Sequence, residues 1–231
     1  MKPICTAVIV AAGKGKRMGT EISKQFLPLC GREILAHTVE KFEKAEKIRD
    51  IVLVTGEESL QDVKEMAQEY DWQKIRSIAA GGRERQDSVW NGLQEVSVDA
   101  EIVLIHDGVR PFVTEDMINA SIEMALEMGS CVAGVPAKDT IKVCNSENIA
   151  VDTPDRSTLW QIQTPQTFRR ELIMKAYMQA KEEGFLGTDD ASLAENSGYP
   201  VKVFMGSYRN IKITTKEDLL IGEVFLKEEQ A

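Results

Sequence analysis

Short runs of β-branched and apolar residues, separated by amphipathic segments, constrain the fold of this chain more than any other feature. They occupy residues 7–10, 51–54, 75–78, 102–105 and 131–135. Each run is apolar almost throughout, which is typical of strands buried on both faces of a sheet. Between the runs, apolar residues recur every three or four positions, as in amphipathic helices. The alternation predicts an α/β fold with a doubly wound, mostly parallel sheet.

The alternation is interrupted between residues 139 and 160. Two β-prone stretches, 140–143 and 149–151, flank a turn rich in asparagine and serine, which predicts a projecting β-hairpin. We expect an insertion at about residues 138–158. The alternatives for its role are a lid, an arm that wraps around a second subunit, and a flexible loop with no specific role. The pattern then predicts helices at 171–181, 190–196 and from 216, and strands at 201–204 and 211–214. Without repeats or a low-complexity linker, residues 1–231 are expected to form one domain.

Composition excludes several classes of protein. The chain has 28 Lys and Arg against 37 Asp and Glu, a net charge of −9, so no general nucleic-acid surface is expected. No apolar run approaches the roughly 18 residues of a membrane span. The first residues lack the apolar region of a signal peptide, and the four cysteines form no C-x-x-C pair. We therefore expect a cytoplasmic protein without a membrane partner.

The chemistry available to this chain rests on Lys, Arg and Asp side chains and on Mg²⁺. The two histidines, His37 and His106, form no pair, and no G-x-S-x-G motif occurs. His106 is expected to pack in the core rather than to react. The sequence therefore disfavours a serine–histidine hydrolase and a di-histidine metal site.

A glycine-rich loop follows the first apolar run. In doubly wound sheets, ligands bind beyond the carboxyl ends of the strands, so such loops are candidate sites. Gly13 and Gly15 would let backbone N–H groups approach phosphate oxygens, and Arg17 and Lys24 would neutralise their charge. The spacing matches neither G-x-G-x-x-G nor a Walker A loop. A plain strand-to-helix turn therefore remains the alternative.

Two further loops follow apolar runs. Asp107 comes directly after the fourth run and could hold Mg²⁺ with substrate phosphates, or form a turn and pair with Arg110. Gly81 and Gly82 precede a predicted helix and suit a base edge or a phosphate, with a capped loop as the alternative. Residues 188–192 resemble a helix N-cap, and residues 210–212 a strand with an exposed lysine.

Several short motifs, taken in order, resemble those of one enzyme family. They are AAGKGKRMG, SKQF, GGRERQDSV, HDGVRP, KDTIK, DRSTLWQIQTPQTF, TDDAS and NIKIT. The set resembles the 2-C-methyl-D-erythritol 4-phosphate cytidylyltransferases of non-mevalonate isoprenoid biosynthesis and spans nearly the whole chain. The resemblance implies a Rossmann-like nucleotidyltransferase that transfers CMP from CTP to methylerythritol 4-phosphate and releases pyrophosphate. A ribitol 5-phosphate cytidylyltransferase and a CTP-binding module without turnover are the alternatives.

The resemblance also implies roles for individual residues. The residues expected to be catalytic are Arg17 and Lys24, which would stabilise the transition state, and Arg156 and Lys212, which would aim the attacking phosphate. The expected nucleotide site comprises Ala11, Ala12, Gly13, Gly81, Gly82, Ser88 and Asp107, the last also near Mg²⁺. The expected acceptor site comprises Arg110, Thr140, Arg156, Thr164, Thr188 and Lys212. The resemblance also implies a homodimer. Thr140 and Arg156 would lie on the hairpin arm and reach the acceptor that is bound by the second subunit.

Positive side chains suit this reaction. A phosphate monoester must attack an α-phosphorus that already carries negative charge, so fixed cations have to offset the repulsion between the reactants. No general base is needed, because the second pKa of a phosphate monoester is about 6 and the acceptor is largely ionised near neutral pH. A chain with only two histidines is compatible with this chemistry.

Overall fold

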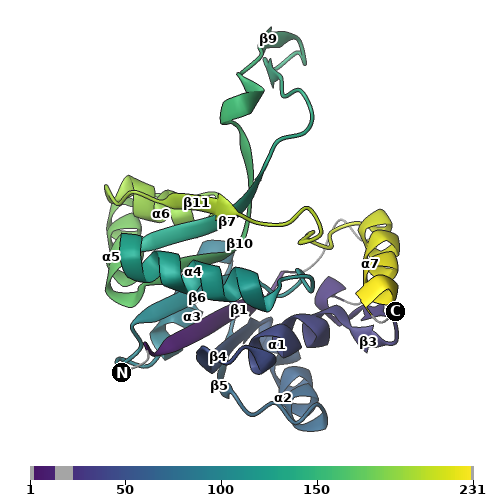
Figure 1. The fold of residues 1–231 in the computed structure, drawn as a ribbon. Helices are drawn as coiled ribbons and strands as arrows, with labels where there is room; N and C mark the ends of the chain where they lie inside the picture. Colours follow the sequence, from purple (N-terminus) through teal and green to yellow (C-terminus); the bar gives the residue numbers. More distant parts are fainter. Residues whose placement is uncertain (1–2, 14–22, 230–231) are drawn as a thin grey trace.

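A seven-stranded sheet forms the centre of the computed structural model, which describes residues 3–13 and 23–229 (Figure 1). The strand order is β11-β7-β10-β6-β1-β4-β5. The strands are β1 (Cys5–Ala11), β4 (Ile48–Thr55), β5 (Ile75–Ala80), β6 (Ile102–Asp107), β7 (Ser130–Pro136), β10 (Trp160–Arg169) and β11 (Lys202–Met205). All neighbours pair in parallel except those of β10. The predicted mostly parallel sheet is confirmed, and each of the five apolar runs lies in a strand.

Helices cover both faces of the sheet. They are α1 (Ile34–Lys44), α2 (Leu60–Glu69), α3 (Arg85–Glu95), α4 (Glu115–Met128), α5 (Arg170–Glu183), α6 (Asp190–Asn196) and α7 (Lys216–Glu229). Ala7 and Ile9 of β1 pack with α1, α2 and α4, whereas Val8 packs with α3, α5 and α6. The strand therefore contributes to two cores, as its continuous apolar run predicts. The helices predicted after the hairpin correspond to α5, α6 and α7. Within the described residues, no helix is both long and apolar enough to cross a membrane.

Strand β10 was not predicted, although it lies in the middle of the sheet. It runs antiparallel between β6 and β7. Its sequence mixes glutamine and threonine with apolar residues and contains Pro165, which cannot donate a hydrogen bond to a central ladder. The pairing with β7 shifts between Ile162 and Gln166, so Pro165 lies at an irregularity that tolerates it. The polar residues and the proline of this segment therefore do not match the sequence pattern that predicts a central strand.

The strand predicted at residues 211–214 is wrong. These residues are not assigned to any strand, and Ile213 N–H donates to Val109 O at 2.9 Å. Ile213 is buried in a small cluster with Leu29, Phe112 and Leu226 of α7. The alternation of apolar residues here reflects packing under α7 and not membership of the sheet. This arrangement places Lys212 beside the end of β6, where its Nζ lies 2.8 Å from Asp107 Oδ2.

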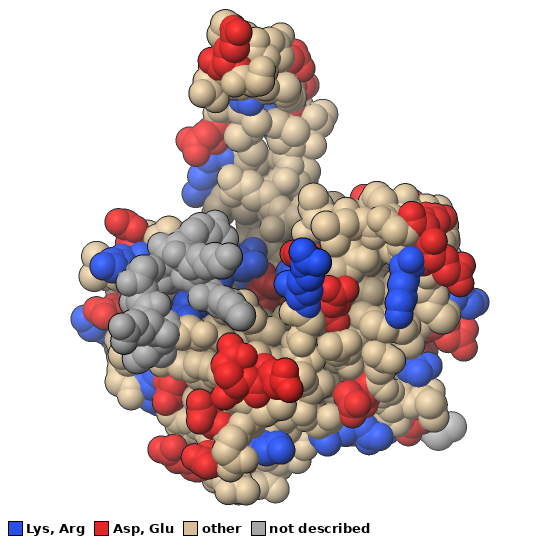
Figure 2. Space-filling view, turned by 180° about the vertical axis from the view of Figure 1, so that it is seen from behind, with Lys and Arg blue, Asp and Glu red and all other residues tan. Residues whose placement is uncertain are grey.

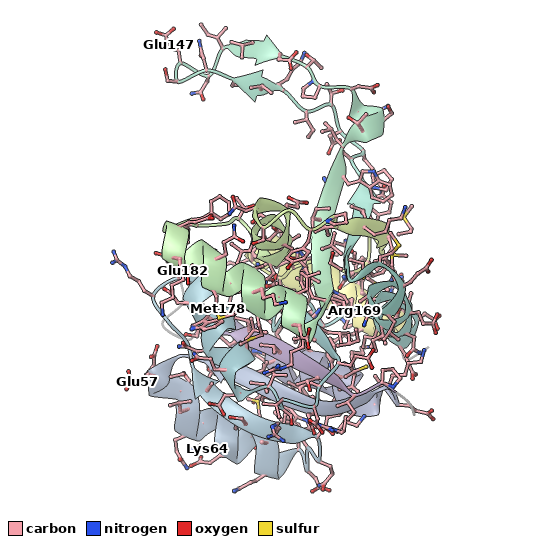
Figure 3. All side chains as sticks on the ribbon, turned by 90° about the vertical axis from the view of Figure 1, so that its left-hand side faces the viewer. Glu57, Lys64, Glu147, Arg169, Met178 and Glu182 are labelled. Carbon is pink, nitrogen blue, oxygen red and sulfur yellow. The ribbon has the colours of Figure 1, made fainter. Side chains whose placement is uncertain are left out.

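A two-stranded hairpin projects from the body and is called the arm (residues 138–158) (Figure 1). Its strands, β8 (Val143–Cys144) and β9 (Ala150–Asp152), differ by a few residues from the predicted ones. Asn145 closes the turn, because its Oδ1 accepts hydrogen bonds from the N–H groups of Glu147 and Ile149. Glu147 lies at the tip, far from the body (Figure 3). Residues 138–153 are all exposed.

Candidate active site

A cavity of about 580 Å³ opens at the carboxyl ends of β1 and β6, beside the first turn of α3. This is the edge at which doubly wound sheets bind ligands. The predicted site residues that line it are Ala11, Ala12, Gly13, Lys24, Gly82, Ser88, Asp107 and Lys212. Lys24 begins the short 3₁₀ helix η2 (Lys24–Phe26). Residues from distant parts of the sequence therefore meet in one cavity.

Asp107 lies at the end of β6 among three cationic side chains. Its Oδ2 is 2.8 Å from Lys212 Nζ and 3.7 Å from Arg110 Nε, and its Oδ1 accepts from Arg85 Nε at 3.2 Å. Burial alone would raise the pKa of Asp107, but Arg85, Lys212 and Arg110 hold that pKa well below its ordinary value. The carboxylate is therefore ionised and holds Lys212 at the cavity wall.

Arg85 connects this site to a second buried carboxylate. Its Nη1 and Nη2 donate to Asp190 Oδ1 and Oδ2 at 3.0 and 2.9 Å, and Tyr177 Oη donates to Asp190 Oδ1 at 2.6 Å. Asp190 is fully buried, so this bidentate pair fixes the guanidinium that contacts Asp107. No role for Arg85 follows from the sequence alone. Its partners lie 22 and 105 residues away along the chain, so no local spacing indicates the contact.

Two glycines let the loop after β5 pack closely against its neighbours. A Cβ on Gly81 would lie 2.3 Å from Ala12 Cβ, and one on Gly82 would lie 2.3 Å from Asp87 Cβ. Gly82 N–H donates to Ser88 Oγ, and that hydroxyl donates to Glu84 O, both at 3.0 Å. Larger residues would push the loops apart, so both glycines are required by packing. Gly81 itself does not line the cavity but supports Ala12, which does.

A chain of hydrogen bonds runs beneath the cavity. Asp107 N–H donates to Thr164 Oγ1 at 3.1 Å, and Thr164 Oγ1 lies 3.0 Å from His106 Nδ1. His106 Nε2 faces Arg110 O at 3.1 Å, which assigns the proton to Nε2 and leaves Nδ1 to accept from the threonine hydroxyl. Burial lowers the pKa of His106 to about 4, so the ring is neutral. His106 packs in the core, as predicted.

The other predicted residues that the structure describes are not part of the cavity lining. Thr164 is buried and its hydroxyl is occupied by the two contacts just described. Thr188 is exposed on the segment before α6. Thr140 and Arg156 are exposed on the arm, where Arg156 Nη1 donates to Lys138 O at 2.9 Å. Arg17 lies outside the described residues.

The cavity offers few ligands for a metal ion. No group of three or more His, Cys, Asp or Glu side chains able to hold a metal occurs among the described residues. Asp190 does not line the cavity, so the buried acid among the described lining residues is Asp107, whose two oxygens are contacted by Arg85, Lys212 and Arg110. Mg²⁺ commonly binds through one or two carboxylates, substrate phosphates and water. The residues therefore fit Mg²⁺ only as an ion that arrives with phosphate ligands.

Comparison with known proteins identifies the family. Residues 5–228 match the family model described as 2-C-methyl-D-erythritol 4-phosphate cytidylyltransferase. A relative of that name from Alkaliphilus oremlandii is 49% identical over 223 residues, covering 96% of this chain and 94% of the relative. Another from Caldanaerobacter subterraneus subsp. tengcongensis is 47% identical over 224 residues, covering 96% and 99%.

Solved structures agree with the sequence comparison. The chain is similar to the 4-diphosphocytidyl-2C-methyl-D-erythritol synthase of Anaerococcus prevotii, with a TM-score of 0.87, 32% identity, and coverage of 98% and 97% of the two chains. It is also similar to the 2-C-methyl-D-erythritol 4-phosphate cytidylyltransferase of Thermus thermophilus, with a TM-score of 0.79, 28% identity, and coverage of 95% and 98%. The resemblance found in the motifs is confirmed: this chain belongs to the 2-C-methyl-D-erythritol 4-phosphate cytidylyltransferase family.

Proposed function

We propose that this protein transfers the cytidylyl group of CTP to the phosphate of 2-C-methyl-D-erythritol 4-phosphate in isoprenoid biosynthesis. The observation that carries the proposal is the meeting of Lys24, Asp107, Lys212 and the glycine-rich loops in one cavity. A volume of about 580 Å³ suits a nucleotide-sized ligand. Family membership supplies the identity of the two substrates, and the cavity supplies a place where they can react.

In the proposed reaction, an oxygen of the acceptor phosphate attacks the α-phosphorus of CTP. The bond from the α-phosphorus to the oxygen that bridges the β-phosphate breaks, and pyrophosphate leaves with the bonding electron pair. Lys24 stabilises negative charge on the phosphates, and Lys212 orients the acceptor phosphate. Arg17 shares the first role and Arg156 the second. The nucleotide site is shaped by Ala11, Ala12, Gly13, Gly82 and Ser88, and Gly81 packs behind Ala12.

Mg²⁺ belongs to the proposal as an ion held by Asp107 together with the triphosphate of CTP. When bound, it would neutralise charge that develops on the phosphate oxygens. Asp107 is suited to this because neighbouring cations keep it ionised over the working pH range. Arg85 and Arg110 would hold the carboxylate in place while the nucleotide binds.

The acceptor site is proposed to be completed by a second copy of the chain. Thr140 and Arg156 lie on the arm and outside the cavity of their own chain. The arm also exposes four large apolar side chains, Ile141, Val143, Ile149 and Val151, to between 41% and 61%. Such exposure is typical of a surface that is buried in an assembly. A homodimer in which each arm reaches the other's cavity accounts for both observations.

The cytoplasm is the proposed location. All four cysteines lie within the described residues and carry free thiols, which suits a reducing compartment. On the face that Figure 2 shows, Lys and Arg side chains are interspersed with Asp and Glu and form no broad basic surface among the described residues. This distribution favours small anionic substrates over nucleic acid.

Pyrophosphate release tests the proposed reaction. The purified protein is incubated with CTP and Mg²⁺, and with either 2-C-methyl-D-erythritol 4-phosphate or ribitol 5-phosphate. We expect rapid release with the first acceptor, loss of activity when the metal is chelated, and a product in which CMP is joined to the acceptor phosphate. Faster release with ribitol 5-phosphate would overturn the choice of acceptor. CTP binding without any product at high enzyme concentration would favour a binding module.

A further inference from the structure

Residues 185–191, which link α5 to the first residues of α6, are held in place by side chains from other elements. Gln86 Nε2 donates to Phe185 O at 3.1 Å, and Gly187 N–H donates to Gln86 Oε1 at 3.0 Å. One carboxamide therefore binds two main-chain groups of the segment, once as donor and once as acceptor. Thr188 follows directly after the second of these groups.

The far end of the segment is anchored from the sheet. Gln166 of β10 donates from Nε2 to Asp189 Oδ2 at 2.8 Å and accepts from Ala191 N–H at 2.9 Å through Oε1. Gln166 is only 2% exposed, so this anchor is fixed by packing. At the near end, Gln86 supplies the two side-chain hydrogen bonds, and Phe185 N–H also donates to Ala180 O at 2.8 Å. A Cβ on Gly187 would lie 2.4 Å from Ser192 Oγ, so the segment folds closely over the start of α6.

Gln86 belongs to the same helical turn that builds the nucleotide side of the cavity. Its neighbour Arg85 lines the cavity and contacts Asp107. Two residues further on, Ser88 Oγ accepts from Gly82 N–H. Gln86 itself is half-buried and does not line the cavity. The start of α3 therefore carries Arg85 and Ser88, which belong to the nucleotide side of the cavity, and also Gln86, which binds residues 185–188.

We propose that Gln86 is a positioning residue that sets the place of residues 185–188, and with them Thr188, relative to the nucleotide loop. This inference rests on the proposed function and on the role in acceptor binding that the family resemblance implies for Thr188. A glutamine is required because the two main-chain groups need a donor and an acceptor at the end of one side chain. A glutamate at this position keeps the acceptor for Gly187 N–H but offers no donor to Phe185 O.

Kinetics of Gln86→Ala test the positioning role. Loss of two neutral hydrogen bonds is expected to raise KM for 2-C-methyl-D-erythritol 4-phosphate about tenfold. KM for CTP is expected to stay within about twofold of the wild-type value, because no cavity-lining side chain is changed. Gln86→Glu is expected to give an intermediate KM for the acceptor. Gln179→Ala is the matched control, since Gln179 is half-buried, as Gln86 is, and bonds Glu183 of its own helix.

Hydrogen exchange supplies a readout that is independent of turnover. The Gly187 amide is expected to exchange about tenfold faster in Gln86→Ala and at a near wild-type rate in Gln86→Glu, which keeps its acceptor. Unchanged Gly187 exchange in Gln86→Ala, or equal increases in both KM values, would overturn the positioning role. A wild-type protein that does not use this acceptor would instead overturn the proposed function, whereas the exchange comparison would still decide what holds the segment.

Discussion

The cavity and the arm are built in opposite ways. At the cavity, Asp107 is buried, three cationic side chains surround its carboxylate, and its main-chain N–H is bonded to Thr164. On the arm, residues 138–153 are exposed, and the two strands have two and three residues. Isolated hairpins of this size are marginally stable in water. The cavity is thus organised within one chain, whereas the proposed homodimer would give the arm a second chain to pack against.

This difference explains how the candidate residues divide. Lys24, Asp107 and Lys212 meet in the cavity of their own chain, but Thr140 and Arg156 do not. Nucleotide binding is therefore expected to need one chain, and acceptor binding two.

Lys24→Ala is expected to lower kcat by more than about a hundredfold, the scale of one lost charge-stabilising contact in a transition state. CTP binding should weaken much less, because the glycine-rich loops remain. Steady-state kinetics and CTP titration measure the two effects. Lys44→Ala is the matched control, since the Lys44 side chain is 77% exposed on α1. Turnover near the wild-type rate would remove Lys24 from the mechanism.

Mixing two inactive variants tests whether the arm acts in a second subunit. In a heterodimer of Lys24→Ala and Arg156→Ala chains, one site carries both changes and the other carries neither. Random exchange of subunits should therefore restore about a quarter of the wild-type activity. A mixture of Lys24→Ala and Lys212→Ala is the control, because both residues line the same cavity and no intact site can form. If the first mixture also stays inactive while mass measurements show mixed dimers, the arm does not complete the site.

The free energy of unfolding is expected to fall as pH is lowered from about 6.5 toward 4. Burial lowers the pKa of His106 from 6.5 to about 4, so the unfolded chain takes up a proton in this range that the folded chain does not. The loss between pH 6.5 and pH 5 should be about 1.5 kcal/mol, measured by urea unfolding at each pH. His106→Gln should remove most of this dependence. Burial also lowers the pKa of His37, which contributes with the same sign.

An unchanged pH dependence in His106→Gln would show that burial of His106 does not lower its pKa in the folded protein. No comparable effect is expected from the arm, because its sequence contains no histidine and residues 138–153 are exposed to water. The difference between the wild-type protein and His106→Gln therefore reports on the residue beneath the cavity.

Much of the architecture was predictable because its causes are local. Continuous apolar runs indicated five strands, glycines marked the loops around the cavity, and the asparagine-rich turn indicated the arm. One predicted strand was wrong and one strand was missed, for a common reason. The strand at residues 211–214 was wrong because its apolar residues pack under α7, and β10 was missed because its polar residues bond to distant partners such as Asp189. In both segments, tertiary contacts override the local pattern.

The sequence by itself determined the family, the order of most elements and the charged residues available for phosphate chemistry. These features follow from periodicity and from motifs, which involve residues that lie close together along the chain. Only the tertiary structure decided that Arg85 joins Asp107 to Asp190, that Thr164 is occupied by Asp107 and His106, and that Gln86 holds the segment before Thr188. These contacts join residues that lie 22 to 105 positions apart along the chain. Such pairs are chosen by the packing of the whole fold, and no local spacing encodes them.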